Sequence, residues 1–145
     1  MPIVWSPDLN TGIEIIDKQH MQIVDYINQL EGQHDRKLIG HILDELVDYT
    51  QSHFSFEESL TEEAGYKLLK PHKEVHKVFI KRVAEYQQRF KSGEDIAAEI
   101  EKLLSSWLVN HIKRDDADYV SSVKAHLAGK KEGGWLGKAL KKFFG

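Results

Sequence analysis

Residues 36–64 read RKLIGHILDELVDYTQSHFSFEESLTEEA, and their pattern decides the fold class. Apolar side chains recur here at three- and four-residue steps, which is the period of one face of an α-helix. His53 and Glu57, four residues apart, belong to the same helical stretch. A helix of this length needs other amphipathic helices to cover its apolar face. The expected inner stripe consists of Leu38, Ile42, Leu46, Tyr49, His53, Phe56 and Leu60.

Three further stretches show the same periodicity. The first is expected to follow Asp17 as an N-terminal cap, the third to start at Pro71, and the fourth to run from about Glu94 to about residue 127, with or without a break. An irregular arm over residues 1–16 precedes them. Four amphipathic helices with short connections predict an all-α fold, an antiparallel up-down-up-down four-helix bundle.

The C-terminal segment differs chemically from the rest of the chain. Residues 129–145 contain five lysines and one acid, whereas the whole chain has a net charge of −3. Apolar residues recur at helical spacing among the lysines, which predicts a short basic amphipathic tail. Such a tail could dock on an anionic membrane surface or a protein partner, or it could fold back on the bundle. We therefore divide the chain into a bundle, 1–128, and a tail, 129–145.

Composition narrows the classes of protein further. The chain has 145 residues, enough for one domain with its own core, and no cysteine, so a metal would be held by nitrogen and oxygen. The acidic net charge argues against nucleic acid as a partner. No apolar run approaches the roughly 18 residues of a membrane span, and the N-terminus does not resemble a secretory signal. We expect a cytoplasmic monomer.

A set of histidines and acids recurs at metal-binding spacing. A lone histidine on an apolar stripe is more often a hydrogen-bonded core residue. Five such imidazoles with carboxylates would, however, carry a heavy desolvation cost if they held no ligand. Residues four apart on a helix share a face and can reach one ion. The candidates are His20; His53 with Glu57; His72 with His76; and His111 with Asp115 or Asp116.

Seven protein ligands are too many for one tetrahedral zinc and suit two octahedral ions that share carboxylate bridges. Di-iron oxidases of ferritin type use mostly glutamate in such a bundle. A histidine-rich centre carries more positive charge and favours reversible dioxygen binding over oxygen cleavage.

The sequence resembles the hemerythrin family, in its single-domain bacterial branch, the bacteriohemerythrins. The likeness covers residues from about 5 to 120, and four motifs carry it: GIEIIDKQH at 12–20, HFSFEE at 53–58, HKEVH at 72–76 and HIKRDD at 111–116. The resemblance implies two non-haem iron ions in a four-helix bundle, with dioxygen as the ligand. One iron would be bound by His72, His76 and His111, and the other by His20 and His53, which leaves one position open. The two would be bridged by Glu57, Asp116 and an oxo or hydroxo group.

The aspartate ligand is a point of conflict. A step of four from His111 rotates by about 40° around a regular helix and favours Asp115, whereas a step of five rotates by about 140°. The family pattern selects Asp116, and a widened helical turn would reconcile the two. We predict Asp116.

The expected function is reversible dioxygen binding for storage, transport or delivery inside a cell, without enzyme activity. The alternatives are an oxygen or redox sensor module, or a di-iron oxidase or enzyme acting on peroxide or nitric oxide. The walls of an oxygen pocket are expected from Ile23, Phe54, Leu103 and Trp107, all of which could equally be ordinary core residues.

Overall fold

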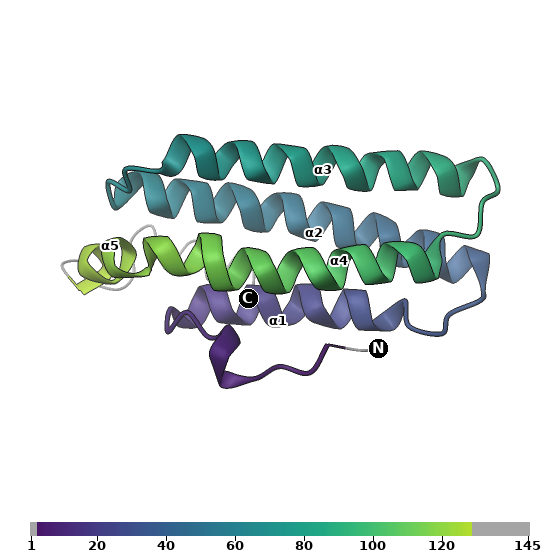
Figure 1. Cartoon of the computed structure of the whole chain (residues 1–145), viewed down its shortest axis with the longest axis horizontal. Helices are drawn as coiled ribbons and strands as arrows, with labels where there is room; N and C mark the ends of the chain where they lie inside the picture. The colour runs from purple at the N-terminus through teal and green to yellow at the C-terminus, as the bar shows by residue number, and fades with distance from the viewer. Residues whose placement is uncertain (1–2, 129–145) are drawn as a thin grey trace.

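The computed structural model describes residues 3–128, which form a bundle of helices. Figure 1 shows four long helices side by side: α1 (Glu14–Gln29), α2 (Arg36–Glu63), α3 (Leu69–Lys91) and α4 (Ala97–His111). Short connections join them at alternating ends, so consecutive helices are antiparallel, and contacts between α1 and α4 close the bundle. The predicted all-α up-down-up-down bundle is confirmed.

Two shorter features adjoin the bundle. In the N-terminal arm, η1 (Pro7–Leu9) is a single 3₁₀ turn. At the other end of the chain, α4 passes through the π-helical turn η2 (Ile112–Asp116) into α5 (Ala117–Ala128), which lies at one end of the bundle (Figure 1). Among residues 3–128, no helix combines the length and the apolar character needed to cross a bilayer. The basic tail expected at 129–145 lies outside the described residues.

Helix ends follow local chemistry. The Asp35 carboxylate caps α2 by accepting hydrogen bonds from the backbone N–H groups of residues 37 and 38. Gly65 follows Ala64, the C-terminal cap of α2, and has φ of 71°, a left-handed conformation that suits glycine. The N–H groups of Gly65 and Tyr66 donate to the carbonyls of Glu62 and Thr61, so the last carbonyls of the helix are satisfied.

Several expectations about helix boundaries and faces are wrong. The helix α1 begins at Glu14, and Asp17 lies inside it, where its carboxylate accepts hydrogen bonds from the backbone and hydroxyl of Thr11 and from the N–H of Gly12. Asp17 therefore holds the arm rather than capping the helix. Leu38 is 42% exposed and its neighbour Ile39 is 3% exposed, because one residue rotates a helical side chain by about 100°.

The other boundary differences are smaller. The helix α3 begins at Leu69, two residues before Pro71, and α4 begins at Ala97 rather than near Glu94. Both shifts move the helix start by two or three residues without changing the number or order of the helices.

Two apolar clusters make up the core, and a polar layer lies where they meet. On α1, Ile16 belongs to the smaller cluster and Ile23 to the larger one, with His20 between them. From α4 to α5 the same change occurs between Ile112 and Tyr119. The bundle thus places a buried polar layer near one end of a long apolar core.

Candidate metal centre

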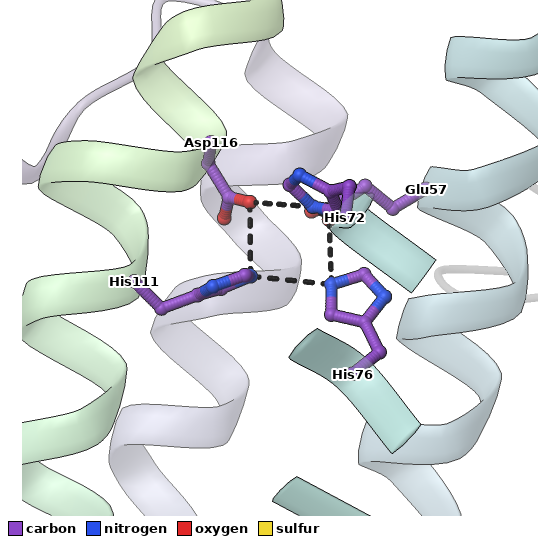
Figure 2. A group of neighbouring side chains, drawn as sticks. All are labelled: Glu57, His72, His76, His111 and Asp116. Carbon is purple, nitrogen blue, oxygen red and sulfur yellow. Dashed lines mark hydrogen bonds and ion pairs between the residues drawn. The ribbon is translucent and has the colours of Figure 1, made fainter. Parts of the chain in front are cut away.

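Seven ionisable side chains gather in this polar layer, and none is more than 4% exposed. All four long helices supply at least one, and Figure 2 shows five of the seven pointing toward one another. The His72–His76 pair and the His53–Glu57 pair each lie four residues apart on a single helix, so the members of each pair share a face. They are His20 on α1, His53 and Glu57 on α2, His72 and His76 on α3, His111 on α4 and Asp116 at the end of η2.

The two oxygens of Glu57 face different histidines. Its Oε1 lies 2.8 Å from His72 Nε2 and 3.2 Å from His76 Nε2. Its Oε2 lies 3.2 Å from His53 Nε2 and 3.8 Å from His20 Nε2. A carboxylate whose oxygens face two separate sets of nitrogen donors has the arrangement needed to bridge two cations.

Asp116 divides its oxygens in the same way. Its Oδ1 lies 3.1 Å from His111 Nε2 and 3.2 Å from His72 Nε2, whereas its Oδ2 lies 3.1 Å from His20 Nε2. Within short distances of one another, the ligand atoms form two groups that share Glu57. These groups are Glu57, His72, His76, His111 and Asp116; and His20, His53 and Glu57.

The π-helical turn places the two aspartates in different surroundings. A π turn takes up one residue more than an α turn, so the residue five after His111 returns to the same face. Asp116 is therefore fully buried among the histidines, whereas the Asp115 side chain is 20% exposed and accepts a hydrogen bond from His111 Nδ1 at 2.8 Å. This turn is of the widened kind that reconciles helical spacing with the predicted Asp116.

The imidazole tautomers test whether a cation fits. The Nδ1 atoms of His76 and His111 each lie 2.8 Å from a carboxylate oxygen, of Glu58 and Asp115 respectively, and so must carry protons to donate. When both rings are neutral, their Nε2 atoms carry only lone pairs, yet these two atoms face each other at 3.2 Å (Figure 2). Two opposed lone pairs repel, and a cation held between them would remove that repulsion.

Unsatisfied buried atoms support the same conclusion. Among residues 3–128, both nitrogens of His20 and both carboxylate oxygens of Asp116 are buried without a hydrogen-bond partner, although His20 Nε2 and Asp116 Oδ2 are close together. A buried polar group without a partner costs about 1–3 kcal/mol. Coordination to a metal would satisfy these atoms, so the donor set fits cations.

The carboxylates perturb the pKa values of the histidines. Burial alone would lower the pKa of His20, but the nearby carboxylates of Asp116 and Glu57 outweigh burial and raise the pKa to about 9. The pKa of His72 is raised to about 10, again because Asp116 and Glu57 outweigh burial. For His53, burial is the larger effect and lowers the pKa. Metal binding to His20 and His72 would therefore release protons.

Two residues that contact the centre are absent from the set predicted from the sequence. Gln19, which is fully buried, has its Oε1 2.6 Å from His53 Nδ1. Tyr119, also fully buried, donates its hydroxyl to Glu57 Oε2 at 3.1 Å. Gln19 could have been found, because it precedes a candidate ligand. Tyr119 carried no local signal.

The four expected pocket residues differ in their placement. Ile23 and Phe54 are buried in the larger apolar cluster, and Phe54 stacks on the His76 ring with centroids 3.7 Å apart. Trp107 is partly buried and stacks on His111 at 4.4 Å. Leu103 is only half-buried, whereas Leu104 is 1% exposed. Apolar walls beside the histidines are therefore present, and the oxygen pocket itself stays a prediction.

Comparison with known proteins agrees with this geometry. The family model for the hemerythrin HHE cation binding domain matches residues 11–122, which include all seven candidate ligands. The chain belongs to the hemerythrin family. A bacteriohemerythrin from Stenotrophomonas maltophilia (strain R551-3) is 53% identical over 150 aligned positions, which cover 99% of this chain and 98% of that protein. A bacteriohemerythrin from Pseudomonas aeruginosa (strain LESB58) is 50% identical with the same coverage.

Solved hemerythrin structures share the fold. A crystal structure of wild-type hemerythrin superposes with a TM-score of 0.80 at 30% identity, covering 85% of this chain and 98% of that one. The family match and the bundle therefore agree on a hemerythrin domain whose buried histidines and carboxylates suit cation binding.

Proposed function

We propose that this hemerythrin binds dioxygen reversibly at a non-haem di-iron centre and stores, transports or delivers oxygen inside a cell. One observation carries the proposal: Glu57 and Asp116 each turn one oxygen toward His72 and the other toward His20. This arrangement suits two bridged ions rather than one. The family membership of the chain supports iron as the metal.

In this proposal the two ions have different ligand sets. Glu57 and Asp116 would be shared by both ions. His72, His76 and His111 would hold one ion, whereas only His20 and His53 would hold the other. The second ion would have one histidine fewer, which would leave room for dioxygen on that side. When bound, the iron pair supplies the two electrons that reversible dioxygen binding requires.

The protein side chains keep this site dry and rigid. Phe54 and Trp107 stack on His76 and His111, and Ile23 packs in the apolar cluster one turn after His20. Apolar surroundings keep out water and anions that would promote irreversible oxidation. We propose Ile23, Phe54, Leu103 and Trp107 as walls of the oxygen pocket, with Leu103 the least buried of the four.

The acids around the centre support a carrier rather than an enzyme. Within residues 3–128, Glu57 and Asp116 face the histidines, and Glu58 and Asp115 each bind a histidine Nδ1. Each of these four carboxylates is therefore already engaged by a histidine, which leaves none of them poised to activate a substrate. All seven proposed ligands come from one chain, which supports a monomer, and the lack of cysteine suits the cytoplasm.

Oxygen titration of the iron-loaded, chemically reduced protein tests the proposal. We expect two irons per chain, and oxygen uptake that is reversed when the gas is removed. His20→Gln should lose oxygen binding, because it removes one of only two histidines at the second ion. His41→Gln is the matched control, since His41 is exposed and pairs with Glu45. Irreversible oxidation with continuing turnover would instead identify an enzyme.

A further inference from the structure

The outer nitrogens of the candidate ligand histidines have unequal partners. His76 Nδ1 donates to the Glu58 carboxylate and His111 Nδ1 donates to the Asp115 carboxylate, both at 2.8 Å. His53 Nδ1 lies 2.6 Å from the amide oxygen of Gln19, a neutral acceptor. His20 Nδ1 has no hydrogen-bond partner within the part of the chain that the structure describes.

The difference between these Nδ1 partners matches the division of the ligands into a three-histidine group and a two-histidine group. Two of the three histidines in the three-histidine group are held by charged carboxylates. In the two-histidine group, one imidazole is held by an amide and the other has no acceptor. A carboxylate that accepts an imidazole N–H makes the ring a stronger donor to its metal. The three-histidine ion therefore receives more electron density and more nearby negative charge than its neighbour.

We propose that Gln19 is a positioning residue that keeps the two-histidine iron easier to reduce than the three-histidine iron. Negative charge close to a metal favours its ferric form, and a neutral acceptor at His53 leaves the ferrous form favoured at that ion. This inference rests on the proposed function, because it assigns the more reducible iron to the side where dioxygen would bind. Because a neutral amide favours the ferrous form of this ion, Gln19 also makes the centre more resistant to autoxidation.

Burial strengthens the effect of residue 19. Gln19 is fully buried, whereas the side chains of Glu58 and Asp115 are 24% and 20% exposed. Solvent screens a charge at position 19 less than a charge at either carboxylate. The simpler explanation is that an amide stands here only because a buried carboxylate is costly. That explanation predicts a change in apo-protein stability but no ordered change in the potentials of the two irons.

The test measures the two one-electron reduction potentials of the iron-loaded full chain by spectroelectrochemical titration. Gln19→Glu lowers the higher potential and Glu58→Gln raises the lower one. Both variants therefore narrow the separation between the two reduction potentials. The mean of the two potentials falls in Gln19→Glu and rises in Glu58→Gln. We expect about a tenfold change in the ratio of reduced to oxidised iron, which is 59 mV for a one-electron couple. Gln19→Met removes the acceptor without adding charge, so the separation widens.

The control is Gln88→Glu, which adds the same charge at an exposed position of α3, twelve residues and thus roughly 18 Å along the helix from His76. It should move neither potential by a comparable amount. Thermal unfolding of each apo-protein shows whether a variant folds. If Gln19→Glu does not fold, Gln19→Met and Glu58→Gln still give opposite predictions for the separation.

Two results would overturn the inference: an unchanged separation in the folded variants, or means that move in the same direction in Gln19→Glu and Glu58→Gln. Failure of the proposed function would look different. In that case the unmodified chain would not retain two irons or would not bind oxygen reversibly. If iron content and reversible oxygen binding are normal but the two reduction potentials do not shift in the expected directions, only the role of Gln19 is rejected.

Discussion

Replacing Tyr119 by phenylalanine removes a single hydroxyl from the buried layer. That hydroxyl donates to Glu57 Oε2 at 3.1 Å, and a hydrogen bond to a charged group contributes about 1.5–3 kcal/mol. Because His53 Nε2 also lies 3.2 Å from the same oxygen, Glu57 keeps part of its stabilisation. We therefore expect Tyr119→Phe to lower the free energy of unfolding by about 1.5–2 kcal/mol, at the lower end of that range.

Thermal unfolding of the metal-free protein, followed by circular dichroism in chelator at neutral pH, is the assay. At about 3–4 °C per kcal/mol for a domain of this size, the midpoint should fall by about 5–8 °C. Tyr66→Phe is the matched control, because its hydroxyl donates to Asp118 at the surface, and its loss should cost less than about 0.5 kcal/mol. Equal midpoints for the two variants would refute the view that the Tyr119 hydroxyl supports the bridging carboxylate.

Three further predictions concern metal binding and stability. Asp116→Asn should lose at least one iron per chain in metal analysis. Asp115→Asn should keep both irons but bind them on the order of tenfold more weakly, as expected for a residue that acts through His111. Loss of iron in Asp115→Asn but not in Asp116→Asn would contradict the assignment of Asp116 as the ligand. The pKa of His20 is raised to about 9 in the folded protein, compared with about 6.5 in the unfolded chain. Protonated His20 therefore stabilises the fold fully below pH 6.5, and this stabilisation is lost as the pH rises through 9. The thermal unfolding midpoint of the apo-protein should fall over pH 6.5–9, whereas that of the iron-loaded protein should not. Leu60→Ala, at a fully buried position, should lower the free energy of unfolding of the apo-protein by about 2–5 kcal/mol in denaturant unfolding. After iron loading, this variant should still bind two irons. A loss below about 1 kcal/mol would show that the smaller apolar cluster is loosely packed.

Local spacing was enough to predict much of this protein. The four helices follow from apolar periodicity, and the His53–Glu57 and His72–His76 pairs follow from the same helical geometry. Periodicity was a poorer guide to exact faces and ends. It placed Leu38 inward and used Asp17 as a cap, because contacts with the arm and the neighbouring helices decide both.

The fold class and the types of donor atom follow from the sequence alone, because helical periodicity and four-residue spacing are properties of one continuous segment. The packing of the helices fixes what the sequence leaves open: Glu57 and Asp116 divide their oxygens between two histidine groups, and Tyr119 contacts Glu57 from α5. These features depend on distances between helices that are far apart in the chain. Such distances follow from the packing of the whole bundle.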